Sequence, residues 1–399
     1  MQIKATPIRL SDAQRLDWLR LIRSENVGPR TFRALIDRYG GAGPALEALP
    51  ELARRGGAKQ LRIASLESVE REIADCAKLG VRIIAFGEPE YPPALRKIDS
   101  APPILLLHGR EEAMQQPALS IVGSRNASAA GLTFADRLAR ALGNAGYIIV
   151  SGLARGIDQR AHVASLATGT IGVLAGGHAK PYPPEAAPLL PRIAEFGAII
   201  SEMPPQWEPR GSDFPRRNRL VSGLSLGLIV IEAARGSGTL ITAKYAADQG
   251  REVFAVPGSP LDPRAEGTND LLRDGANICT RVEDVLAIID PMRARDPFAD
   301  LPGIAASLGS PAQARLLGLD SAASLDEADE LEPSEGAGDE AARQRLRIIE
   351  LLGPSPVSLD DLARSLSAPM GEVRGLLLEL DLAGRLEFSG GDRVALRVE

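Results

Sequence analysis

The length, composition and charge of the chain set the first limits on its function. With 399 residues, 44% of them hydrophobic and 25% charged, the chain is long enough for two or three domains with ordinary cores. Its net charge of −6 weighs against a uniformly basic nucleic-acid binder. However, nine carboxylates lie between Asp320 and Glu340 without a Lys or Arg, so much of the acid is confined to one stretch. DNA responds to the local field, so the overall sign leaves room for a basic surface elsewhere.

Several kinds of site have no support in the sequence. Cys76 and Cys279 form neither a metal-ligand nor a redox spacing and predict no disulfide framework. The three histidines lack metal-ligand partners at helical spacing, so no metal is expected: His108, His162 and His178. There is no P-loop and no G-x-G-x-x-G after the first core strand, which argues against an ATPase and against a nicotinamide cofactor. No signal peptide or membrane-spanning run is found, which predicts a cytoplasmic protein.

Residues 1–75 are expected to form a small helical domain. Ser11 begins a capping box with Gln14, and a tight turn at residues 26–30 precedes a second amphipathic stretch. This arrangement resembles helix-hairpin-helix and SAM-like modules, some of which hold a phosphate on the turn amides. One Gly-Pro turn is a weak signal, so we favour a hairpin that serves packing only.

Residues 76–290 show the alternation of strand and helix that is typical of a parallel sheet. Two strands are predicted at residues 81–86 and 103–108, and short runs rich in Val and Ile follow. Most of these runs are separated by helical patterns, as at residues 133–142, 158–167 and 242–249. We therefore predict an α/β fold with a Rossmann-like, doubly wound, mainly parallel sheet covered on both faces. The core strands are predicted at residues 119–122, 147–150, 172–175, 198–200, 226–231 and 252–256.

The remainder of the chain is expected to be a linker and a third domain. Residues 291–341 are rich in Pro, Gly, Ala and acid, as in a solvated linker. Residues 342–399 show three helical patterns and a short hairpin, which is the outline of a winged helix. Arg374 is the main cation on the third helix, the recognition helix of such domains. We therefore expect this domain to make protein contacts rather than to bind DNA.

Three of the core strands lead into loops rich in Gly and Ser that open helices. These loops begin at Gly123, Ser151 and Glu232. Glycine permits close approach of a ligand, and the first amides of a helix favour anions, phosphate above all. Because the carboxyl ends of parallel strands share one edge of a sheet, we expect one phosphate-binding edge. Within it, Asp158 is expected to orient loop amides rather than to act as a general base.

The strongest single stretch is Phe214-Pro215-Arg216-Arg217-Asn218-Arg219. Arginine binds phosphate with a planar fork, asparagine can hydrogen-bond a base edge, and phenylalanine can stack on an unpaired base. The alternative is a solvated surface loop with its ring tucked into the core. The anion-binding loops expected nearby favour the ligand-binding interpretation.

Five motifs follow one another along the chain in the order Val122-Gly123-Ser124-Arg125, Ser151-Gly152-x-Ala154-x-Gly156-Ile157-Asp158, Phe214-Pro215-x-Arg217-Asn218-Arg219, Ser237-Gly238-Thr239-Leu240-Ile241-Thr242-Ala243 and Ala255-Val256-Pro257-Gly258. Together these motifs resemble the DNA-processing protein A (DprA/Smf) family of bacteria, from about Ile83 to Leu286. The N-terminal helices and the C-terminal domain also match a layout seen in some members.

The resemblance implies an extended Rossmann core in a protein that is not an enzyme and needs no cofactor. It implies a homodimer that binds single-stranded DNA, protects incoming strands and helps load RecA recombinase in natural transformation. The low aromatic content, 4%, predicts affinity dominated by phosphate contacts and therefore steeply dependent on salt. Carried over by motif and position, the expected DNA-binding residues are Gly123, Ser124, Arg125, Ser151, Gly152, Phe214, Arg216, Arg217, Asn218, Arg219, Ser237, Gly238, Thr239 and Lys244.

Two other functions remain open at this point. The loop at residues 235–239 loosely echoes the P-G-G-x-G-T hallmark of Rossmann-like enzymes that hydrolyse nucleoside monophosphates, with Glu232 as the required catalytic carboxylate. Alternatively, the chain is an adaptor whose C-terminal domain recruits a partner. We favour DNA binding, then the nucleoside monophosphate phosphoribohydrolase-like enzyme, then the adaptor.

Overall fold

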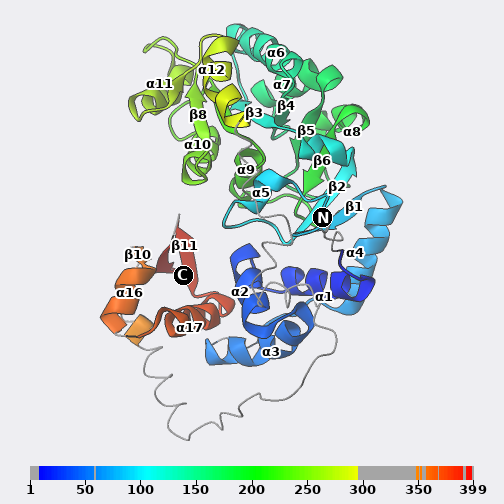
Figure 1. Cartoon of the computed structure of the whole chain (residues 1–399), viewed down its shortest axis with the longest axis vertical. Helices are drawn as coiled ribbons and strands as arrows, with labels where there is room; N and C mark the ends of the chain where they lie inside the picture. Colours follow the sequence, from blue (N-terminus) through cyan, green and yellow to red (C-terminus); the bar gives the residue numbers. More distant parts are fainter. Residues whose placement is uncertain are drawn as a thin grey trace, which may run out of the picture. The chain divides into compact units, whose positions relative to one another are not determined.

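A computed structural model gives the fold of residues 9–57, 60–294, 347–349, 351–352, 356–366, 368–389 and 392–397 (Figure 1). Contacts between residues divide the chain into two compact units, and each is described by itself. The first unit contains residues 70–306 together with the first nine residues of the chain. The second unit joins residues 10–69 to residues 307–399.

The first unit is built on a 9-stranded sheet. Seven strands, in the spatial order β6-β5-β4-β3-β7-β8-β9, are parallel to one another. β2 pairs antiparallel with β6, and β1 pairs antiparallel with β2. The predicted mainly parallel, Rossmann-like sheet is therefore confirmed. The strands are β1 (Arg82–Ala85), β2 (Ile104–Gly109), β3 (Ala118–Gly123), β4 (Ile148–Ser151), β5 (Thr170–Val173), β6 (Ala198–Ser201), β7 (Gly227–Ile231), β8 (Glu252–Ala255) and β9 (Asn277–Ile278).

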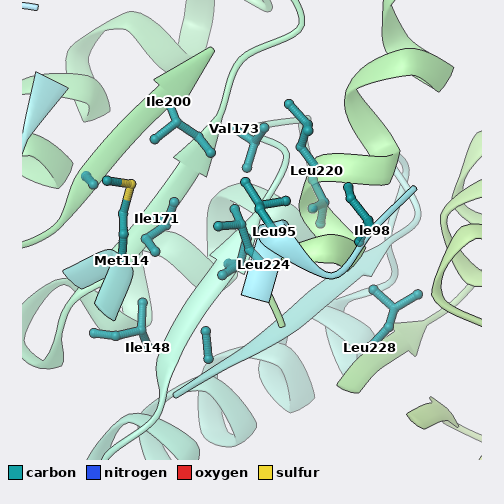
Figure 2. Packing of buried hydrophobic residues seen from close by; sticks show 14 of the residues in the cluster. Leu95, Ile98, Met114, Ile148, Ile171, Val173, Ile200, Leu220, Leu224 and Leu228 are labelled. Atoms are coloured by element: carbon teal, nitrogen blue, oxygen red, sulfur yellow. The ribbon is translucent and has the colours of Figure 1, made fainter. Parts of the chain in front are cut away.

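Helices cover both faces of this sheet because successive side chains of a strand point to opposite sides. Ile149 and Ile229 pack with residues of α6, α7 and α12, whereas Val150 and Val230 pack with residues of α5, α9 and α10. Figure 2 shows part of this second cluster. Burial on both faces explains why the strands are apolar runs without alternation. The helices of residues 66–294 are α4 (Leu66–Lys78), α5 (Pro93–Arg96), α6 (Ala129–Asn144), α7 (Ile157–Ser165), α8 (Leu190–Phe196), α9 (Asp213–Gly223), α10 (Gly238–Asp248), α11 (Glu266–Arg273) and α12 (Val282–Ala294).

Two elements differ from the sequence-based expectations. The Phe214–Arg219 stretch lies in helix α9, which polar residues and Pro215 had hidden from the hydrophobic pattern. Proline is compatible with the first turn of a helix, and burial of Leu220 and Val221 anchors the rest. Helix α12 ends at Ala294, so the linker predicted from residue 291 begins inside a helix. The remainder of that predicted linker lies outside the described residues.

The second unit contains the expected helical hairpin and winged helix. The predicted capping box is present: Gln14 N donates to Ser11 Oγ at 3.2 Å, and Ser11 N donates to Gln14 Oε1 at 2.9 Å. The second helix of the winged helix is also capped, because Asp361 N donates to Ser358 Oγ at 3.1 Å. The elements of this unit include α1 (Asp12–Arg23), α2 (Pro29–Tyr39), α3 (Ala42–Arg55), β10 (Val357–Ser358), α16 (Leu359–Leu366), α17 (Met370–Leu382), β11 (Leu386–Ser389) and β12 (Arg393–Leu396).

Helix α17, the expected recognition helix, is covered on two sides within the second unit. One side packs into the winged-helix core, and the C-terminal half contacts α2 and α3 of the helical hairpin. There, Thr31 Oγ1 donates to Asp381 Oδ2 at 2.6 Å, and Asn26 Nδ2 donates to the Leu382 carbonyl at 2.9 Å. A Cβ on Gly56 would lie 1.9 Å from the Glu379 carbonyl oxygen, so glycine makes this contact possible. The C-terminal domain therefore serves a protein contact inside its own chain.

Candidate nucleic-acid interface

The loops that follow β3, β4 and β7 lie together at one edge of the sheet, as the sequence predicted. β3 lies between β4 and β7, and all three strands are parallel. Hydrogen bonds link the loops: Ile157 N donates to the Ser124 carbonyl at 3.3 Å, and Thr239 Oγ1 donates to the Gly123 carbonyl at 3.2 Å. We call the residues 123–128, 151–158 and 232–239 the rim.

The first turns of α9 are tied to the rim. Asn218 Nδ2 donates to the Gly238 carbonyl at 3.3 Å. Arg217 Nη1 donates to the Val173 carbonyl at 2.6 Å and also to the Gly152 carbonyl. The arginine-rich stretch and the strand-end loops, which are far apart in sequence, therefore form one site.

Two of the arginines in α9 are buried instead of facing a ligand. Arg217 is 7% exposed and Arg219 is 5% exposed. Arg219 forms an ion pair with Glu202, which is also buried, while Arg217 binds backbone carbonyls. The expectation that both would form the exposed basic side of the site is therefore not met by this geometry. They hold the elements of the site in place.

A buried carboxylate completes this internal framework. Asp158 accepts hydrogen bonds from the backbone N–H of Gly152 at 3.1 Å and of Ala154 at 3.4 Å, which confirms its predicted role in orienting the loop. Burial raises the pKa of Asp158 to about 6, and the positive charge of Arg217 opposes that rise. Asp158 and Arg217 thus fix the loop after β4 through its amides and its Gly152 carbonyl, respectively.

Many of the rim amides are already paired within the protein. These bonds run from Gly152 and Ala154 to Asp158, from Asn126 to Ser124, from Ser128 to Glu232 and from Thr239 to Ser237. Such amides are not available to a phosphate. Attraction of an anion to the rim therefore depends more on side-chain cations than the sequence suggested.

Cationic side chains at this edge do reach solvent. Arg125, Arg155 and Lys244 are exposed. The Arg216 side chain is 39% exposed and forms an ion pair with Glu202 at 3.1 Å. Arg155 was absent from the sequence-based set, although its position in the loop after β4 was a sufficient signal.

Arg125, the exposed arginine that follows β3, lies over one ring of an aromatic pair. The Arg125 guanidinium carbon is 5.8 Å from the centroid of the Phe214 ring. The Tyr182 ring packs edge-to-face on Phe214, with centroids 5.3 Å apart and planes at 67°. Tyr182 was missed by sequence reasoning because its segment, Lys180-Pro-Tyr-Pro-Pro, has no regular pattern. It follows β5, which lies beside β4, and this placement is the signal that could have found it.

Several predicted ligand-binding residues have structural contacts instead. A Cβ on Gly123 would lie 1.9 Å from the Ile231 carbonyl oxygen, and one on Gly152 would lie 2.5 Å from Arg217 Nη1. Ser151 is buried, and its hydroxyl donates to the Ile121 carbonyl at 2.6 Å. By contrast, a Cβ on Gly238 would meet no atom within 4 Å, and Ser124, Ser237 and Thr239 are half-buried.

Glu232, the carboxylate required by the hydrolase alternative, is engaged in holding the rim. It adopts the left-handed conformation, with φ of 53°. Its Oε2 accepts from Ser128 N at 2.9 Å, and its Oε1 accepts from the Ser128 hydroxyl. Ser128 in turn caps α6 by accepting from Gly131 N at 2.9 Å. Both carboxylate oxygens of Glu232 thus bind Ser128 in the loop after β3, and they do so from a residue with a strained, left-handed backbone.

The described residues contain neither a candidate metal site nor a candidate membrane-spanning helix. They contain no group of three or more His, Cys, Asp or Glu side chains that could hold a metal ion. None of their helices is long and apolar enough to cross a membrane.

Comparisons with known proteins agree with this architecture. Residues 82–290 match the family described as DNA recombination-mediator protein A, residues 12–74 match the DprA-like N-terminal HHH domain, and residues 332–392 match the DprA winged helix domain. The DNA processing protein DprA of Bacillus subtilis is 36% identical over 263 residues, which cover 63% of this chain and 89% of that protein. Protein Smf of Synechocystis is 33% identical over 324 residues, which cover 78% of this chain and 79% of the relative.

A solved structure shows the same likeness. The X-ray structure of DNA processing protein A from Streptococcus pneumoniae superposes with a TM-score of 0.58 at 30% sequence identity, covering 70% of this chain and 99% of that one. The family resemblance of the sequence motifs is confirmed. With all three of its parts matched in order, the chain belongs to the DNA recombination-mediator protein A family.

Proposed function

We propose that the rim binds single-stranded DNA without sequence specificity, and that the protein acts by binding rather than by catalysis. The observation that carries this proposal is the contact of Arg125 with the Phe214 ring, which in turn packs on Tyr182, beside the rim with its exposed Arg155. Cations meet the phosphates of a strand, and rings stack on bases that are unpaired. Duplex grooves are usually read by a protruding helix or ribbon, whereas the described rim consists of loops and first helical turns.

The names of the family and of its relatives support a cellular role for this binding. The relatives are named DNA processing proteins, and the family is described as a recombination mediator. We therefore propose that the protein acts in the cytoplasm as a homodimer. In this role it protects incoming strands and helps load RecA recombinase during natural transformation. RecA-driven strand exchange on single strands coated with a competing binding protein should speed up when the chain is added. An unchanged rate would remove RecA loading from the proposal and leave DNA binding intact.

The binding claim is tested by titrating a labelled oligonucleotide, first single-stranded and then duplex, at low and physiological salt. Arg125→Ala with Lys244→Ala should weaken single-strand binding and flatten the slope of log affinity against log salt by about 0.7 for each lost phosphate contact. The matched control is Lys78→Ala with Arg140→Ala, which removes the same charges from helices α4 and α6. These helices lead into β1 and β4 at the opposite, amino edge of the sheet.

Three results would contradict the binding proposal. They are absence of binding by the wild type, preference for duplex, and equal loss in the rim variant and its control. The claim against catalysis is tested separately with a panel of nucleoside monophosphates. Release of free base that disappears in Glu232→Gln would establish the hydrolase instead.

A further inference from the structure

A second ring lies beside the rim, next to Phe214, and is not part of the family motifs quoted above. Tyr182 lies after β5, in a segment fixed by backbone hydrogen bonds: Gly177 N donates to the Trp207 carbonyl at 2.9 Å, and Ala179 N donates to the Pro205 carbonyl at 2.9 Å. Tyr182 as a whole residue is 43% exposed. An exposed ring on an anchored segment is suited to a contact with a ligand.

Phe214, the ring singled out from the sequence, has much of its surface already in use. It is half-buried, and it contacts both the Arg125 guanidinium and the Tyr182 ring. Arg125 lies over the ring itself, where a base would otherwise stack. Tyr182 is therefore the ring of the pair with more surface left for a ligand.

We propose that Tyr182, beside the rim, is the base-stacking residue of the site and that Phe214 is its support. This inference rests on the proposed binding of single-stranded DNA and names the ligand group, the flat face of an unpaired base. The edge-to-face contact restrains the Tyr182 ring, which reduces the entropy lost when a base stacks on it. Stacking of this kind tolerates every base, because every base has a π-face.

The charges around the ring suit the same ligand. Arg125 lies at the Phe214 side of the pair. Lys180, two residues before Tyr182, has a side chain that is 45% exposed and stands 3.9 Å from Glu208. Arg210 stacks on Trp207, with 4.8 Å between its guanidinium carbon and the ring centroid. One cation thus lies on the partner ring of Tyr182, and another lies two residues before Tyr182 in the chain; both suit the phosphates that flank a stacked base.

The test compares two labelled oligonucleotides of equal length, oligo-dT and its abasic counterpart, which keeps the phosphates but offers nothing to stack. Tyr182→Ala should lower affinity for oligo-dT by about fivefold to 150-fold, the range for one lost stacked base. It should leave affinity for the abasic strand unchanged. Tyr182→Phe should bind both strands like the wild type, because the face of the ring is kept.

Two further variants sharpen the result. Phe196→Ala removes the ring of a residue that is 45% exposed at the end of α8, which leads into β6 at the amino edge, and should change neither affinity. Phe214→Ala should weaken oligo-dT binding, and adding Tyr182→Ala should cost little more, because the support and the platform act together. Melting curves check that each variant is folded.

The outcomes separate the two proposals. If the wild type binds oligo-dT and Tyr182→Ala binds it equally well, the stacking role is wrong and DNA binding stands. Equal losses on oligo-dT and on the abasic strand would show that Tyr182 acts only on the shape of the rim, which also overturns the stacking role. A wild type that binds neither strand overturns both proposals.

Discussion

Two helices of this chain invite comparison as possible DNA contacts, α9 at the rim and α17 in the winged helix. α9 keeps Phe214 and Asn218 partly exposed at the edge where Arg125 reaches solvent. α17 is the helix that a winged helix normally offers to DNA. Its C-terminal half is instead closed by hydrogen bonds from Thr31 and Asn26 of the helical hairpin.

On the proposed function, the exposed groups rather than the type of domain decide which surface meets DNA. On α17, Leu378 and Leu382 are buried, and Arg374 shares the exposed surface with Glu372, so the helix presents no basic face. On α9, two arginines are buried, yet their work inside the protein keeps the ring and the loops in place. A basic motif can thus contribute to binding through residues that never touch the ligand.

The largest effect on stability is expected from substituting the buried Arg217, in contrast to the exposed Arg125. Arg217→Ala should lower the free energy of unfolding by about 3–5 kcal/mol, because the buried carbonyls of Gly152 and Val173 lose their hydrogen bonds and Asp158 loses a nearby positive charge. Arg125→Ala should leave stability unchanged and weaken DNA binding. Urea unfolding followed by circular dichroism measures the first effect and oligonucleotide titration the second. An Arg217→Ala protein that is fully stable would refute the internal role.

Acid should destabilise the first unit through His162. Burial, with a contribution from the nearby Arg217 charge, lowers the pKa of this histidine to about 3, from 6.5. The unfolded chain therefore binds a proton below about pH 6.5 that the folded unit does not, and stability falls as pH falls towards 3. Between pH 6.5 and 4.5 the loss that His162 contributes should reach roughly 2–3 kcal/mol, and proton uptake by the folded Asp158, whose pKa is raised to about 6, offsets part of it. His162→Gln should flatten this part of the profile in urea unfolding; an unaltered slope would rule out the histidine as its source.

A side chain at Gly56 should release α17 from the hairpin. Gly56→Val would place its Cβ against the backbone carbonyl of Glu379, which cannot move without shifting the helix, at a cost of about 1–3 kcal/mol. Limited proteolysis should then cut the winged helix sooner, while the rim keeps its affinity for single strands. If affinity rises or falls together with the release, the two regions are not independent and the comparison fails.

The smallest effect is expected at the exposed cation of α17. Arg374→Ala should leave single-strand affinity within about twofold and stability within about 0.5 kcal/mol, since surface substitutions away from a site rarely do more. The same titration used for Arg125→Ala measures it. Losses as large as those at Arg125 would place DNA on the winged helix.

Much of the fold could be predicted because it depends on local patterns. The apolar strand runs, the capping box at Ser11 and the glycines that end β3 and β4 each leave a signal within a few residues. The parallel order then brings the loops to one edge. The burial of Arg217 and Arg219 could not be predicted in this way, because the Gly152 carbonyl and Glu202 that bind them come from other parts of the chain. Tyr182 escaped for the same reason, since only the packed structure sets it against Phe214.

Hydrogen–deuterium exchange of the full chain, with and without a single-stranded oligonucleotide, tests the location of the DNA site most directly. DNA should slow exchange in residues 123–128, 151–158, 179–183, 213–219 and 232–244, and should leave exchange in residues 356–397 as it is in the free protein. Slower exchange confined to residues 356–397, with the rim unaffected, would show that the DNA site does not lie at the rim.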